Sequence, residues 1–128
     1  MQLIPHLLLR SESAASRAAV LLRDAGYMVT KVTDDEMAMQ LASSLEVDGV
    51  VIDLPTLPAI HAVRQMHAIH GAPPVLVISR APDLVRRSTG AAALHAGEVE
   101  EELISATDLW LASHEKARSP AVGTGAAR

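Results

Sequence analysis

The sequence lacks cysteine and phenylalanine, and it contains one tryptophan and one tyrosine. Without cysteine, disulfides and thiolate metal sites are excluded, and the chain is compatible with a reducing compartment. Apolar residues nevertheless make up 49% of the 128 residues. The core must therefore consist of leucine, valine, isoleucine, alanine and methionine. This length fits a single domain that is large enough to bury a substantial apolar core.

Long apolar runs and an excess of positive charge are also missing. The opening segment, MQLIPHLLLR, is too short to span a membrane and lacks the basic start of a signal peptide. The formal net charge of -4 argues against a nucleic-acid-binding surface. We therefore expect a cytoplasmic protein that binds neither membranes nor nucleic acid.

Apolar strand-like segments alternate with amphipathic helical segments along the chain. The predicted strands cover residues 3–9, 27–33, 48–54, 73–79 and 91–95, and the predicted helices cover residues 13–26, 33–45, 59–71, 81–90 and 98–113. Continuous apolar strands separated by amphipathic helices are typical of a parallel sheet covered on both faces. The sequence therefore predicts an α/β fold with five strand–helix units.

Several residues predict where the helices begin and end. Thr33 and Glu36 have the spacing of a capping box. Pro82 and Gly90 enclose a fourth helix of about two turns. We place the domain at residues 1–115. Residues 116–128 are rich in small and turn-forming residues, which predicts a flexible tail or linker.

One charged residue ends the apolar run of the third predicted strand. In GVVIDLPTLP, residues 49–58, Asp53 follows four apolar residues and precedes two prolines. Ligand sites in parallel sheets lie at the carboxyl ends of the strands. Asp53 is therefore the first candidate for a functional site.

Three segments together resemble the receiver domain of bacterial two-component response regulators. They are LLRDAGYMV, DGVVIDLPTLP and PPVLVIS, and the resemblance extends over residues 3–113. It implies a doubly wound, flavodoxin-like (βα)5 sheet. Gly90 follows Ser79 more closely than in that family, which predicts a shortened fourth helix. The resemblance also implies that Asp53 matches the phosphorylated aspartate and that Ser79 matches the switch hydroxyl of the fourth strand.

The rest of that family's site departs from the pattern. The two carboxylates that hold Mg²⁺ would fall on Leu9-Arg10 or Arg10-Ser11, and Glu12 is the only acid nearby. Mg²⁺ prefers oxygen ligands that include one or two carboxylates, and a guanidinium repels it. No lysine occurs between Lys31 and Lys116, so His95 is the nearest substitute for the family's lysine.

These departures predict a degenerate receiver domain, or pseudo-receiver. It would be no enzyme, hold no metal or cofactor, and act by phosphorylation-independent protein–protein interaction. The partner would be a signalling or output protein, or a second copy bound through the fourth helix, fifth strand and fifth helix. We expect Arg10 either to substitute for the metal or to form an ion pair with Asp53.

Two alternatives remain open at this point. The first is a phosphorylatable switch that uses Asp53 and Ser79 with Arg10 and Glu12 as substitute groups. The second is a flavodoxin-like enzyme or small-molecule sensor. RSESAAS, which follows the first strand, has no glycine and makes a poor phosphate cradle, so this alternative ranks last.

Other conspicuous residues have simpler explanations. His61, His67 and His70 predict a solvated helix face in preference to a metal site, because no carboxylate accompanies them. Arg86-Arg87 predicts a solvated helix end in preference to an anion or partner contact. Trp110 lies on the apolar stripe of the last helix, which favours a core position over an exposed interface anchor.

Overall fold

The computed structural model describes residues 4–44 and 46–118. Five parallel strands form one sheet in the order β2-β1-β3-β4-β5. The strands are β1 (His6–Ser11), β2 (Met28–Val32), β3 (Gly49–Asp53), β4 (Val75–Ser79) and β5 (Ala92–His95). The helices are α1 (Arg17–Asp24), α2 (Asp35–Ser44), α3 (Thr56–His67), α4 (Pro82–Thr89) and α5 (Val99–Arg118), and a 3-10 turn, η1 (Ala96–Glu98), precedes α5.

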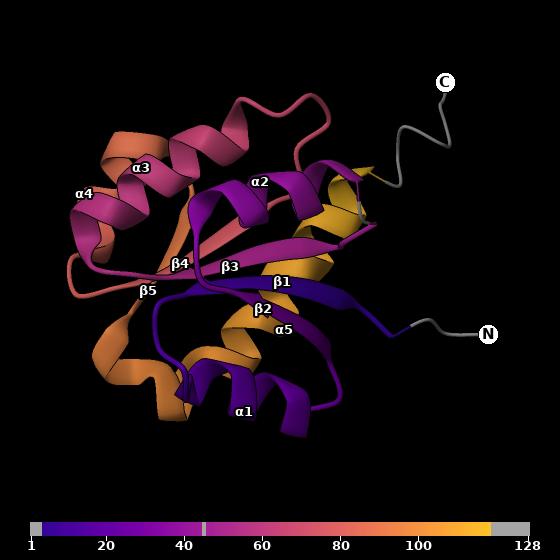
Figure 1. Ribbon diagram of the computed structural model, residues 1–128. Helices are drawn as coiled ribbons and strands as arrows, with labels where there is room; N and C mark the ends of the chain where they lie inside the picture. Colours follow the sequence, from indigo (N-terminus) through magenta and orange to yellow (C-terminus); the bar gives the residue numbers. More distant parts are fainter. Residues whose placement is uncertain (1–3, 45, 119–128) are drawn as a thin grey trace.

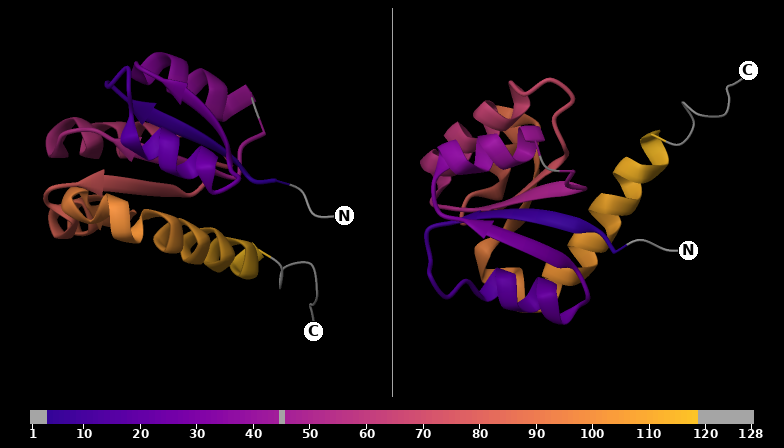
Figure 2. Two further views of the ribbon diagram at one scale, coloured as in Figure 1. Left: turned by 90° about the horizontal axis from the view of Figure 1, so that it is seen from below. Right: turned by 45° about the vertical axis from the view of Figure 1, so that its right-hand side comes forward.

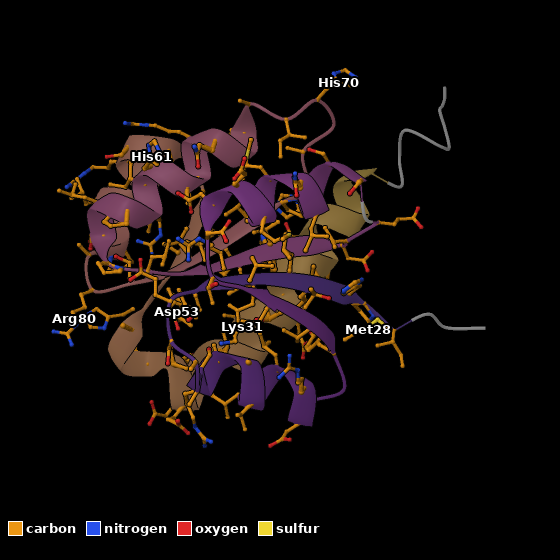
Figure 3. The ribbon with its side chains drawn as sticks, in the orientation of Figure 1. Met28, Lys31, Asp53, His61, His70 and Arg80 are labelled. Carbon is orange, nitrogen blue, oxygen red and sulfur yellow. The ribbon has the colours of Figure 1, made fainter. Side chains whose placement is uncertain are left out.

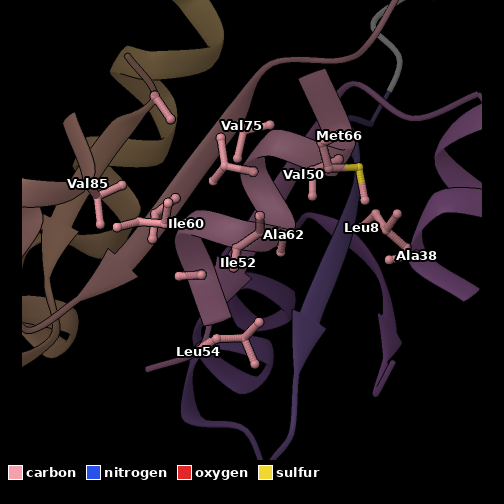
Figure 4. Packing of buried hydrophobic residues seen from close by; sticks show 14 of the residues in the cluster. Leu8, Ala38, Val50, Ile52, Leu54, Ile60, Ala62, Met66, Val75 and Val85 are labelled. Carbon is pink, nitrogen blue, oxygen red and sulfur yellow. The ribbon is translucent and has the colours of Figure 1, made fainter. Parts of the chain in front are cut away.

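Helices cover both faces of the sheet, as the continuous apolar strands predict (Figure 1). One apolar cluster joins α2, α3 and α4 to the sheet, and Figure 4 shows Ile60 of α3 beside Val85 of α4 within it. The second cluster joins α1 and α5 to the opposite face and includes Leu103 and Trp110. The core position predicted for Trp110 is thus confirmed. Among the described residues, no helix is both long and apolar enough to span a bilayer.

The two described ends of the chain lie together at one edge of the sheet (Figures 1 and 2). This is the edge at which the strands begin. The strands end at the opposite edge, where Asp53 lies (Figure 3).

The structure corrects three predicted boundaries. Strand β1 spans His6–Ser11 and not residues 3–9, because pairing with β2 and β3 continues up to Ser11. Helix α2 is capped by Asp34, whose Oδ1 accepts a hydrogen bond from the Met37 amide at 2.7 Å, and not by Thr33. Helix α5 runs to Arg118, so the tail predicted from residue 116 begins inside a helix, and residues 119–128 lie outside the described part.

Helices α3 and α4 both start with proline in the first turn. Thr56 opens α3 and Pro58 follows within that turn, where backbone amides lack an intrahelical acceptor and proline costs little. Helix α4 has eight residues and ends at Gly90, whose φ of 75° favours glycine. The predicted short fourth helix is confirmed.

Candidate functional site

Asp53 lies at the carboxyl edge of the sheet, between β1 and β4. It pairs in register with Ser11 of β1 and Ile78 of β4, and its side chain is half-buried. Burial raises the pKa of the Asp53 carboxyl, and no cation in the described residues contributes to the shift. The charged form of Asp53 therefore loses hydration without gaining a neighbouring positive charge in return.

Ser79 ends β4 and is buried beside the start of α3. Its Oγ accepts a hydrogen bond from the Ala81 amide at 2.9 Å. The same oxygen shares a 3.1 Å hydrogen bond with Oγ1 of Thr56. Sequence reasoning missed Thr56, although its place three residues after Asp53 puts it at the same edge of the sheet.

Arg10 does not form the ion pair with Asp53 that the sequence led us to expect. Its Nε donates to Oδ1 of Asp35, in the first turn of α2, at 2.7 Å. Arg10 pairs in register with Ile52, and both face α2 and α3, whereas Asp53 is the next residue and alternates to the other face. Sequence reasoning missed Asp35 as the partner of Arg10.

The neighbouring polar groups are also bonded within the chain. Oγ of Ser11 accepts from the Ser13 amide at 3.2 Å, and Lys31 Nζ donates to the Ser13 carbonyl. These contacts hold the loop after β1 against the end of β2. Neither side chain makes a hydrogen bond to Asp53 among the residues that the structure describes.

His95, predicted as the nearest substitute for the lysine of the receiver family, is the last residue of β5. It pairs in register with Ser79 and is exposed. Its Nδ1 accepts a hydrogen bond from the Gly97 amide at 2.9 Å and so caps η1. A shallow hollow of about 330 Å³ lies beside it, lined by Arg80, His95, Ala96 and Gly97. Nδ1 of His95 is therefore occupied by a backbone amide of its own chain in this arrangement.

The three histidines near α3 do not gather into a metal site. Figure 3 shows His61 on the outer side of α3 and His70 beyond the end of that helix. Within residues 4–44 and 46–118, no three histidine or carboxylate side chains lie close enough together to hold a metal ion.

The solved structures that the chain resembles include receiver domains of bacterial proteins. The signal receiver domain of an HD domain-containing protein from Pseudomonas fluorescens matches with a TM-score of 0.71 at 21% identity, over 93% of this chain and 95% of that one. The receiver domain of a sensor histidine kinase from Pseudomonas aeruginosa, with a magnesium ion in its active-site cleft, matches with a TM-score of 0.70 at 22% identity, over 86% of this chain and 99% of that one.

The chemotaxis protein CheY4 of Vibrio cholerae matches with a TM-score of 0.66 at 21% identity, over 84% of this chain and 99% of that one. No family model and no curated protein sequence matches the chain. At these identities the likeness shows the fold. The chain therefore has the CheY-like, flavodoxin-like fold of receiver domains, as its sequence predicts, whereas the degenerate variant stays a prediction.

Replacing Asp53 by asparagine is expected to stabilise the fold at neutral pH by up to about 1 kcal/mol, since solvent screens part of the burial cost. The raised pKa means that the free energy of unfolding falls as pH rises from the ordinary aspartate value through the folded value, and then stays low. The Asp53→Asn variant would lack this fall. Urea unfolding across a pH series measures both effects.

The matched control for this prediction is Glu12→Gln. Glu12 is an exposed carboxylate in the loop after β1, near the same edge of the sheet, so its replacement should leave stability unchanged. An Asp53→Asn protein that is less stable than the parent at neutral pH would show that the carboxylate makes a favourable contact.

Proposed function

We propose that this chain is a receiver-like signalling domain that acts through phosphorylation-independent contact with another protein. The observation that carries this proposal is that the polar side chains around Asp53 are hydrogen-bonded to other residues of the chain. Arg10 is bonded to Asp35, Ser79 to Thr56 and the Ala81 amide, and His95 to Gly97. Each of these three side chains thus has a partner within the chain, and none of these bonds involves Asp53.

Charge supports the same proposal. Phosphoryl transfer to a carboxylate is driven by positioning and by cancelling charge on the phosphoryl oxygens. Asp53 contributes one carboxylate, whereas β1 ends in Arg10 and Ser11. A single carboxylate is the minimum that Mg²⁺ usually needs, and no group of three carboxylate or histidine side chains among the described residues surrounds it, so this donor set fits Mg²⁺ poorly.

The partner in this proposal is a protein of a bacterial signalling pathway, in the cytoplasm. Self-association through α4, β5 and α5 is a second form of the same proposal. Arg86 donates to the Ala93 carbonyl at 3.0 Å, so this carbonyl of the edge strand β5 is already bonded within the chain. Sedimentation velocity over a concentration series would detect such a dimer.

One observation favours the phosphorylatable alternative. The Asp53 side chain is only half-buried and lies at the carboxyl edge of the sheet, where β4 ends in Ser79. A phosphodonor could therefore reach it, provided that Ser79 turned away from Thr56. This alternative predicts a covalent mass gain on Asp53.

An amide NMR titration with Mg²⁺, and then with beryllofluoride as a stand-in for the phosphoryl group, decides between the two functions. We expect no shifts that cluster around Asp53 and Ser79. The Asp53→Ala variant is titrated in parallel. Clustered shifts that disappear in this variant would establish the phosphorylatable switch and contradict our proposal.

A further inference from the structure

Charge is distributed unevenly along the chain. Residues 54–97 contain four arginines (Arg64, Arg80, Arg86 and Arg87) and a single acid, Asp83. This segment thus has a formal charge of +3 with neutral histidines, and the rest of the chain carries -7 of the total of -4. The positive segment comprises α3, β4, α4 and β5.

Helical periodicity brings part of this charge to one surface. On α3, exposed Leu57, His61 and Arg64 have i, i+4 and i+7 spacing and share a face. On α4, exposed Leu84 and Arg87 have i, i+3 spacing. Helices α3 and α4 pack against each other through buried side chains, among them Ile60 and Val85 (Figure 4), so the two exposed sets lie on neighbouring helices. We call these five residues the α3–α4 face.

Exposed leucines lie within this positive surface. Leu57 is 74% exposed and Leu84 is 39% exposed. Asp83 is paired with Arg86 of its own helix, and no ion pair in the described residues involves Arg64 or Arg87. The α3–α4 face therefore combines apolar contact area with guanidinium groups that can form bidentate bonds to carboxylates.

We propose that the α3–α4 face binds an acidic segment of a partner protein that also carries apolar side chains. Carboxylates of the segment would meet Arg64 and Arg87, and its apolar side chains would cover Leu57 and Leu84. This rests on the proposed function, which it deepens by naming the surface and the chemistry of the partner.

The composition of the α3–α4 face favours an acidic protein segment over nucleic acid and over a second copy of this chain. Nucleic acid would face the charge of -7 on the rest of the chain, and it would gain little from an exposed leucine such as Leu57. The chain's own acidic segment, at the start of α5, is partly used within the molecule, because Glu100 is paired with Arg17 of α1. A second copy is therefore a poorer match.

The test is an amide NMR titration of the full chain with a synthetic helical peptide that carries a leucine stripe flanked by glutamates. A scrambled peptide of the same composition and a DNA duplex are titrated in parallel. We expect shifts on α3 and α4, and an affinity that falls about tenfold in Leu57→Glu and in Arg64→Glu. Leu109→Glu is the matched control, since Leu109 is 72% exposed on α5.

Several outcomes would overturn the inference. These are no saturable binding, shifts outside α3 and α4, equal binding of the scrambled peptide or of DNA, or equal weakening by Leu109→Glu. Self-association that Leu57→Glu abolishes would assign the face to a second copy instead. The beryllofluoride titration reads Asp53 and Ser79 at the carboxyl edge, so a failure of the proposed function is seen separately from a failure here.

Discussion

Alanine in place of Gly49 is expected to lower the free energy of unfolding by about 3 kcal/mol, the upper range for overpacking a core. Gly49 begins β3, the central strand. A Cβ at this position would lie 2.5 Å from Cη2 of Trp110 and 3.2 Å from Cζ2 and Cζ3. The tryptophan ring is buried between α5 and the sheet, so the ring, the helix or the strand must shift. Urea denaturation measures the loss.

A double-mutant cycle separates this clash from a general cost of alanine in β3. Leucine at position 110 removes the ring atoms that the new Cβ would meet. Gly49→Ala should therefore cost much less in a Trp110→Leu background than in the parent protein. Equal costs in the two backgrounds would show that the contact between Gly49 and Trp110 does not cause the loss.

This pair illustrates what the sequence could and could not predict. The burial of Trp110 was predictable, because its place on the apolar stripe of α5 is a local pattern. The need for glycine at position 49 was not, because it arises from a contact between residues that lie far apart in the sequence. The five strands and their parallel arrangement were predictable for the same local reason, since strands covered on both faces are apolar throughout.

In the candidate site, too, local patterns were predictable from the sequence and contacts between distant residues were not. Asp53 and Ser79 were predictable because each ends an apolar strand, and the carboxyl ends of parallel strands meet at one edge. The partner of Arg10 was not, because several acids end up at that edge. Asp53 ends β3, and Asp35 begins α2 just after β2. The alternation of side chains along β1 decides between them. Arg10 faces α2, and so it bonds to Asp35.

Removing the Asp35 carboxylate is expected to lower the free energy of unfolding by about 3 kcal/mol, because it leaves a buried charge uncompensated. The Arg10 side chain is 8% exposed and that of Asp35 is 30% exposed. Arg10 Nη1 is already buried without a hydrogen-bond partner among the described residues. In Asp35→Ala the guanidinium would also lose its bond through Nε. Chemical denaturation in parallel with the parent protein measures the effect.

Removing the charge of Arg10 should change the free energy of unfolding much less than removing the Asp35 carboxylate does. This difference tests whether the uncompensated buried charge causes the loss. Methionine at position 10 fills a similar volume without charge, and Asp35, which is partly exposed, regains water; we expect a change within about 1 kcal/mol of the parent. The double variant Arg10→Met, Asp35→Ala should then have nearly the same free energy of unfolding as Arg10→Met alone. Glu36→Ala controls for the helix dipole, because Glu36 is an exposed acid in the same first turn of α2. If Asp35→Ala cost no more than Glu36→Ala, the pair would be a solvated surface contact, and Arg10 would remain available to an anion at the carboxyl edge.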